Sequence, residues 1–262
     1  MAVQERQSLA EGTVDLPEPW RSAAVTVVLP TYDEAANLPV IVAGLLALPL
    51  TNVRILVADD NSPDGTGDIA DELAGRYGAD RMTIVHRPEK QGLGRAYVDG
   101  MTRAMAAGAE FVVQMDSDLS HAPKYLPQML GTLLASDADV VIGSRYVAGA
   151  SLATEWSWRR RALSAFANTY VRVLLRLGIR DVTAGFKIWR SSALDAIDVV
   201  SIRSNGYSFQ VEMNYRARLR GLRIVELPIH FKERAEGESK MSLKVQLESA
   251  AMPFKLRRIV RR

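Results

Sequence analysis

The stretch Phe111-Val-Val-Gln-Met-Asp-Ser-Asp-Leu-Ser-His121 decides how this chain is interpreted. Its apolar start predicts a buried strand, and two carboxylates, Asp116 and Asp118, follow that strand directly. Side chains of an extended chain repeat every two residues, so both carboxylates point to the same side. A hard divalent cation relieves their repulsion, and Mg²⁺ is typically held by one or two carboxylates plus substrate phosphates. The stretch therefore predicts a metal-bound diphosphate at a sheet edge, whereas an isolated Asp-x-Asp could be two solvated turn residues.

The same alternation of apolar runs and polar loops fills the first half of the chain. Apolar runs predict strands at 25–29, 54–58, 82–86, 111–115 and 138–142, and helical spacing predicts helices at about 34–48, 67–77, 94–107 and 124–135. Strands and helices that alternate in this way form βαβ units and a mostly parallel sheet. Ligands of such sheets bind beyond the carboxyl ends of the strands. Polar or glycine-rich loops mark that edge four times, at 30–34, 59–66, 87–94 and 116–121.

The pattern changes after Gly149. Apolar residues at three- and four-residue steps predict amphipathic helices at about 156–177 and 243–259, and two strands are predicted at 222–227 and 229–231. The polar start of the chain has no such periodicity. We therefore expect a flexible segment over 1–22, one α/β domain over 23–242 and a basic amphipathic helix over 243–262.

Composition limits the classes of protein to which the chain can belong. Its 262 residues, 48% apolar and 24% charged, suit a soluble α/β domain, and the absence of cysteine excludes disulfides and Cys-based metal sites. No stretch reaches the roughly 20 apolar residues of a membrane span, and the start lacks the apolar centre of a secretory signal. The net charge of +3 includes two acid-free basic clusters, 156–180 and 253–262, which indicate an anionic partner surface.

Seven motifs over residues 25–241 together resemble family-2 glycosyltransferases of the GT-A fold, and more narrowly the polyprenol-phosphate (dolichol-phosphate) mannose synthases. They are Pro30-Thr-Tyr-Asp-Glu34, Asp59-Asp-Asn-Ser-Pro-Asp-Gly-Thr66, Arg87-Pro-Glu-Lys-Gln-Gly-Leu-Gly94, Asp116-Ser-Asp118, Gly143-Ser-Arg-Tyr146, Ala184-Gly-Phe-Lys187 and Phe231-Lys-Glu-Arg-Ala-Glu-Gly-Glu-Ser-Lys240. Each motif alone is weak, but their order and their placement on the predicted elements are specific. The resemblance implies a Rossmann-like, mostly parallel sheet flanked by helices.

The resemblance also implies the donor site. Nucleotide-binding residues would be Pro30, Tyr32, Glu34, Asp60, Lys90, Asp116, Arg234 and Lys240, with Arg234 and Lys240 on a loop that closes over the diphosphate. Carboxylates suit this role because they accept hydrogen bonds from base N–H groups and sugar hydroxyls. The alternatives are a turn-forming role for Asp60 and a helix N-terminal role for Glu34.

The metal of the resembling enzymes would be Mg²⁺ or Mn²⁺, bound by Asp116 and Asp118. Ser120 stands where these synthases often have a glutamine that also reaches the metal, so a serine hydroxyl or a water would replace it. The resemblance makes Asp118, Arg145 and Arg234 the catalytic residues.

A lipid monophosphate acceptor would explain the remaining motifs. Its second pKa is roughly 6 by analogy with phosphorylated side chains, so its oxygen needs no general base. It does need positive charge, which arginine supplies with a fork that matches phosphate. The implied acceptor residues are Arg145, Arg160 and Ser164, although Arg159 or Arg161 could replace Arg160 and Arg145 could instead form a surface salt bridge. Glu212, near a possible base position of relatives with sugar acceptors, is expected to position other groups.

The expected reaction is inverting transfer of mannose from GDP-mannose to a polyprenyl monophosphate. A UDP-glucose-dependent glucosyltransferase is the nearest alternative, and a non-catalytic nucleotide-binding or scaffold subunit is a more distant one. A dinucleotide-dependent oxidoreductase is disfavoured, because the glycine turn 92–94 follows the third strand and lacks a third glycine.

The expected location is cytoplasmic, peripheral on the cytoplasmic face of a membrane. Contact would be through Trp156, Trp158 and the arginine face of 159–180, or through a separate membrane-anchoring protein. Nucleic acid is not an expected partner, because the basic tail over 253–262 lacks interleaved aromatic residues.

Overall fold

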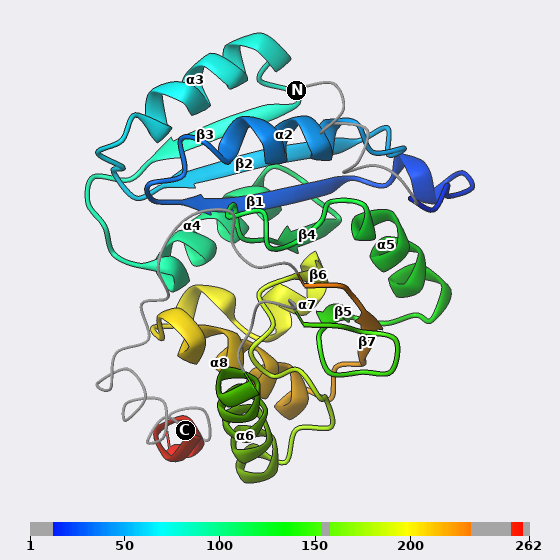
Figure 1. The fold of residues 1–262 in the computed structure, drawn as a ribbon. Helices are drawn as coiled ribbons and strands as arrows, with labels where there is room; N and C mark the ends of the chain where they lie inside the picture. Colours follow the sequence, from blue (N-terminus) through cyan, green and yellow to red (C-terminus); the bar gives the residue numbers. More distant parts are fainter. Residues whose placement is uncertain (1–12, 153–157, 232–252, 259–262) are drawn as a thin grey trace.

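A computed structural model describes residues 13–152, 158–231 and 253–258 of the chain, without the side chains of 159–161 and 207. Its centre is a seven-stranded sheet in the order β3-β2-β1-β4-β6-β5-β7 (Figure 1). The strands are β1 (Val25–Thr31), β2 (Val53–Asp59), β3 (Met82–His86), β4 (Phe111–Gln114), β5 (Val140–Ser144), β6 (Lys187–Arg190) and β7 (Ile224–Pro228). Every neighbouring pair is parallel except the two pairs that β6 forms with β4 and β5. The mostly parallel α/β fold expected from the sequence is therefore confirmed.

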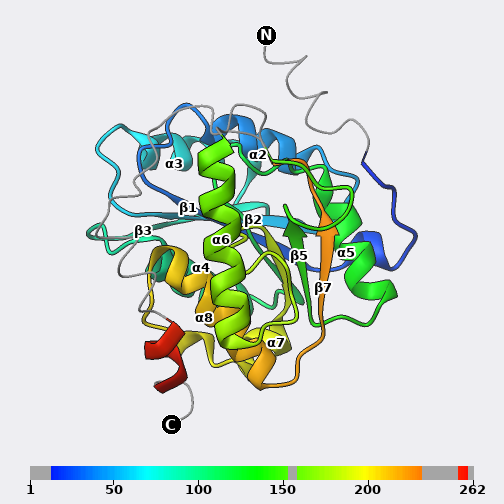
Figure 2. The ribbon, with the colours of Figure 1, turned by 60° about the horizontal axis from the view of Figure 1, so that its bottom comes forward.

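Helices cover both faces of this sheet (Figure 1). They are α2 (Leu38–Leu46), α3 (Thr66–Tyr77), α4 (Leu93–Ala106), α5 (Tyr125–Ala135), α6 (Trp158–Leu175), α7 (Ser191–Ala196) and α8 (Gly206–Leu219), with short 3-10 helices η1 (Trp20–Ser22) and η2 (Val199–Ser201). Alternate strand residues supply two cores, since Val27 packs with α2, α3 and α5 while Val28 packs with α4, α6, α7 and α8. Figure 2 shows α6 next to α8 on the second face.

Three details differ from the sequence predictions. The strand predicted at 229–231 is wrong, because after β7 only His230 pairs, in an isolated bridge with Ser151. Helix α2 begins at Leu38 rather than near Glu34, because residues 32–37 form a loop with Asp33 in a left-handed conformation (φ 60°). Strand β6 and helix α7 were not predicted.

The two ends of the described chain also pack on the domain. Leu16 is buried in the first core, so the packed structure begins before the expected boundary at residue 23. Residues 253–258 are helical and bury Leu256 in the second core, while the rest of the helix predicted at 243–262 lies outside the described residues. Within the described part of the chain, no helix combines the length and the apolarity that crossing a bilayer requires.

Candidate active site

The acidic pair lies directly after β4, where the chain leaves the centre of the sheet. The Tyr97 hydroxyl, from α4, donates to Asp116 Oδ1 at 2.7 Å. The backbone N–H and the hydroxyl of Ser120 donate to Asp118 Oδ1 at 3.1 and 2.6 Å. Leu119 between them has φ of 62°, a conformation that is rare for a branched apolar side chain and costs about 1–3 kcal/mol. The two Ser120 bonds help to hold this strained turn.

The residues of this turn fit a divalent cation that also binds substrate. The described residues include no group of three or more His, Asp or Glu side chains that could enclose a metal by themselves. Two carboxylates are nevertheless the protein contribution typical of Mg²⁺ sites that substrate phosphates complete. Asp116 Oδ2 faces Gly185, where an added Cβ would come within 2.8 Å of it. Glycine thus leaves room for the carboxylate. The role of Ser120 as a metal ligand stays a prediction.

Tyr97 orients Asp116 and was not predicted. It is fully buried, stacks on Phe209 with ring centroids 5.7 Å apart, and has a pKa raised well above its ordinary value by burial and by Asp116. Its hydroxyl therefore stays protonated and donates to the carboxylate at neutral pH.

We expect Tyr97→Phe to weaken Mn²⁺ binding about 10- to 100-fold, because the variant keeps the ring but loses the bond that orients a metal ligand. Electron paramagnetic resonance of free Mn²⁺ in a titration of the protein without donor measures this. Tyr215→Phe, in the same core, is the matched control. Equal Mn²⁺ affinity of the wild type and Tyr97→Phe would contradict the prediction.

The predicted donor residues gather in the loops at the ends of β1, β2 and β3. Pro30 accepts a hydrogen bond at its carbonyl from Ser117 Oγ at 2.8 Å, which ties β1 to the acidic turn. Lys90 Nζ lies 3.1 Å from the centroid of the Tyr32 ring, a cation–π contact between two predicted nucleotide-binding residues. The Glu34 carboxylate accepts from Asn37 Nδ2 at 2.8 Å.

Asp60 is buried and holds the loop after β3. Its carboxylate accepts from Arg87 and, at 3.0 Å, from the backbone N–H of Gly92. This contact fits the structural alternative for Asp60, and its nucleotide contact stays a prediction. With Asp116, the structure thus brings six predicted donor residues to one end of the sheet, whereas Arg234 and Lys240 lie outside the described residues.

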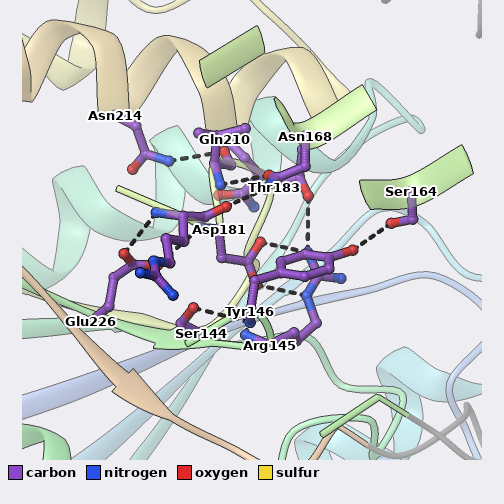
Figure 3. A network of polar contacts seen from close by, with 12 residues as sticks. Ser144, Arg145, Tyr146, Ser164, Asn168, Asp181, Thr183, Gln210, Asn214 and Glu226 are labelled. Carbon is purple, nitrogen blue, oxygen red and sulfur yellow. Dashed lines mark hydrogen bonds and ion pairs between the residues drawn. The ribbon is translucent and has the colours of Figure 1, made fainter. Parts of the chain in front are cut away.

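Arg145, the predicted acceptor-phosphate residue, lies after β5 in a polar network (Figure 3). Its Nε and Nη2 donate to the two Asp181 oxygens at 2.8 and 2.7 Å, and Nη2 also donates to Thr183 Oγ1 at 2.8 Å. Burial would raise the pKa of Asp181, but the guanidinium and the hydrogen bonds from Arg145 hold it below its ordinary value. With side chains 11% and 0% exposed, this ion pair is buried and is not the surface salt bridge considered as the alternative.

The other predicted acceptor residues are only partly described. The Ser164 hydroxyl hydrogen-bonds the Tyr146 hydroxyl at 2.7 Å (Figure 3), so Ser164 lies beside the Arg145 network. The side chains of Arg159, Arg160 and Arg161 lie outside the described residues. Glu212 accepts from Arg216 and Ser204, and its expected positioning role stays a prediction.

A buried lysine behind the site was also missed as a functional candidate. Lys187 Nζ donates to Gln210 Oε1 at 2.9 Å, and burial lowers its pKa to about 7. The Ala184-Gly-Phe-Lys187 motif drew attention to this lysine in the sequence, but the motif does not show that the side chain is buried. Asp181 stood in no motif, so the sequence offered no signal for it.

Comparisons with known proteins show the family of the chain. The family model described as glycosyl transferase family 2 matches residues 26–198. The chain is 48% identical over 216 residues to a polyprenol monophosphomannose synthase of Mycolicibacterium smegmatis, covering 82% of this chain and 80% of that protein. It is 43% identical over 218 residues to an undecaprenyl-phosphate mannosyltransferase of Micrococcus luteus, covering 83% of this chain and 87% of that protein.

Two solved structures share the fold. One is a mannosyltransferase from Pyrobaculum calidifontis in complex with GDP-Man and Mn²⁺, with a TM-score of 0.61, 16% identity and coverage of 100% of this chain and 71% of that chain. The other is a glucosyl-3-phosphoglycerate synthase from Mycobacterium tuberculosis in complex with Mn²⁺, UDP-glucose and phosphoglyceric acid, with a TM-score of 0.62, 18% identity and coverage of 97% and 83%.

Proposed function

The chain belongs to glycosyl transferase family 2, and on that premise we propose that it transfers mannose from GDP-mannose to a polyprenyl monophosphate with inversion at the sugar carbon. The observation that carries this proposal is that a carboxylate pair and an arginine network meet at one edge of the sheet, after β4 and β5. The names of the two relatives support mannose as the sugar and a polyprenyl phosphate as the acceptor.

On the donor side, Asp116 and Asp118 would hold Mg²⁺ or Mn²⁺, which when bound supplies positive charge to the diphosphate leaving group. Pro30, Tyr32, Glu34, Asp60 and Lys90 would hold the nucleotide. Their loops fix one another, since the Glu34 N–H donates to Thr66 Oγ1 at 3.0 Å. Arg234 and Lys240 would cover the diphosphate.

On the acceptor side, an ionised phosphate oxygen attacks the sugar carbon as the diphosphate departs from the opposite face. No protein base is needed, because the second pKa of a phosphate monoester is roughly 6. Arg145, with Arg160 and Ser164, would hold the phosphate. Arg145 donates to Asp181 and Thr183 through Nε and Nη2, so these two residues fix the orientation of its guanidinium at this edge of the sheet.

The membrane would meet α6 as a peripheral partner at the cytoplasmic face. Trp158 and Phe166 on this helix are 74% and 69% exposed, and large apolar side chains in water favour an interface. A separate membrane-anchoring protein would serve the same purpose.

The proposal is tested by incubating the full chain with a short polyprenyl phosphate, divalent metal and either radiolabelled GDP-mannose or UDP-glucose. We expect lipid-extractable label from GDP-mannose with Mg²⁺ or Mn²⁺, and none after chelation. Label from UDP-glucose alone would establish the alternative donor. Absence of transfer from both donors would contradict the proposed function.

A further inference from the structure

A polar cavity of about 300 Å³ lies between α6, Tyr146 and the segment that carries Arg180, and it adjoins the Arg145 network. It is lined by Tyr146, Ala165, Asn168, Thr169, Arg172 and Arg180. The four residues from α6 follow the spacing i, i+3, i+4, i+7, so they form one stripe along the helix. Figure 3 shows Tyr146 and Asn168 on facing elements of this region. The cavity is therefore built by a helix face and two loops.

The charge in this cavity is positive. Within the described part of the chain, neither the Arg172 nor the Arg180 side chain forms an ion pair or a hydrogen bond. The nearby acids are already engaged: Asp181 by Arg145, and Glu226 by the backbone N–H groups of residues 180 and 181 at 2.7 and 2.8 Å. Among the described residues, two guanidinium groups thus line one cavity without an ion-pair partner.

The walls are rigid enough to define a site. Asn168 is buried, donates to the Arg180 carbonyl and accepts from the Val182 N–H at 2.9 Å, which fixes the loop that carries Arg180 against α6. The hydrogen bond between Tyr146 and Ser164 fixes the Tyr146 ring. Guanidinium forks match the geometry of phosphate oxygens, and the Thr169 hydroxyl adds a neutral donor.

An apolar stripe adjoins the cavity on the same helix. Leu163, Phe166 and Val173 are 48%, 69% and 64% exposed, and Phe166 stacks on Tyr170 with ring centroids 6.4 Å apart. Exposed apolar side chains beside a basic cavity favour an amphiphile with a phosphate head over a free anion, because they would be covered by its acyl chains.

We propose that this cavity binds the phosphate headgroup of a membrane phospholipid, at a position distinct from the acceptor phosphate. Tyr146 adjoins both positions, since its hydroxyl contacts Ser164 and the residue lines the cavity, whereas neither Arg145 nor Ser164 lines it. The lipid would hold α6 at the bilayer next to the site of transfer. The proposed lipid binding does not depend on the proposed sugar transfer. Its test measures binding to vesicles without sugar donor or polyprenyl phosphate, so the two proposals can fail separately.

The test is flotation of the full chain with vesicles of phosphatidylcholine alone or mixed equally with phosphatidic acid. We expect Arg172→Gln and Arg180→Gln each to weaken binding to the mixed vesicles about 50-fold, through loss of a charge-assisted bond and of diffuse attraction. Arg176→Gln is the matched control, because Arg176 carries the same charge at the end of α6 but does not line the cavity. We expect Arg176→Gln to weaken binding to the mixed vesicles about fivefold or less. Arg172→Lys keeps the charge but loses the guanidinium fork, so it should retain only the part of the vesicle binding that comes from diffuse electrostatic attraction.

A second arm uses the wild type alone and so does not depend on the folding of a variant. Inorganic phosphate should displace the chain from mixed vesicles more strongly than chloride at equal ionic strength. Equal displacement by both anions, together with equal losses in Arg172→Gln and Arg176→Gln, would overturn the proposal. Competition by phosphate with unchanged vesicle binding of Arg172→Gln would also overturn it, since the site would then serve a soluble phosphate.

Discussion

Asp118→Ala should lower the rate of sugar transfer by about 10³-fold or more while the fold stays intact. Asp118 is 5% exposed in the turn after β4, and it supplies half of the acidic pair. Without it the cation that neutralises the leaving diphosphate loses a ligand, and even a single lost electrostatic contact to developing charge typically costs 10²–10³. Single-turnover transfer from radiolabelled GDP-mannose at saturating Mn²⁺ measures this loss.

The control for this substitution is Asp68→Asn, an exposed acid in the first turn of α3, which should leave the rate unchanged. Asp118→Asn keeps the shape of the side chain and an oxygen that can accept from Ser120, and it should lose nearly as much activity as alanine. Near-normal turnover of Asp118→Ala with metal present would refute the metal assignment.

Arg145→Gln should lower the free energy of unfolding by about 3–5 kcal/mol, because it leaves the buried Asp181 carboxylate without its counter-charge. The Asp181 side chain is fully buried and accepts three hydrogen bonds from Arg145, one of them from the backbone N–H. Equilibrium unfolding in urea at pH 7 measures the difference.

The deficit of this variant should shrink as the pH falls from 7 towards 4. In the wild type the pKa of Asp181 is lowered, so its stabilisation is present above the ordinary value of about 3.9 and is lost as the pH falls through the folded pKa. In the variant, burial without Arg145 should raise this pKa, so protonation relieves the penalty at a higher pH. A deficit that does not change with pH would contradict this account.

A double variant separates the structural from the functional role of Arg145. Arg145→Gln with Asp181→Asn removes both charges and should recover about half or more of the lost free energy. If Arg145 also holds the acceptor phosphate, this stable double variant stays inactive. Recovery of activity together with stability would contradict the acceptor assignment.

Most of the sheet could be predicted because each parallel strand is an apolar run that ends in a polar loop. Strand β6 escaped because its four residues, Lys187–Arg190, begin and end with a basic side chain and show no apolar run. The predicted strand at 229–231 failed because its apolar residues Ile229 and Phe231 do not stay in the sheet, and only His230 pairs. Local pattern therefore reveals strands of the parallel core better than short inserted ones.

The site was predictable where one loop carries the chemistry and not where distant segments meet. The acidic pair could be read from a single strand end. The Tyr97 contact with Asp116 and the Arg145 contact with Asp181 join residues 19 and 36 positions apart, and tertiary packing alone brings them together. Periodicity placed Tyr97 only as a member of a predicted helix, and Asp181 stood in no motif, so their partners could not be foreseen.

The reversed direction of β6 has a consequence for how natural variants of this chain could differ in length. Most loops at the reaction edge leave the sheet and can absorb extra residues. The segment 181–187 instead enters the sheet from this edge. Its first residue, Asp181, pairs with Arg145, and Gly185 packs against Asp116. Its last residue, Lys187, pairs with Gln114 of β4 and so sets the register of β6. One inserted residue would turn the following strand side chains to opposite faces. Insertions and deletions should therefore be absent from these seven positions in working enzymes, even where neighbouring surface loops vary freely.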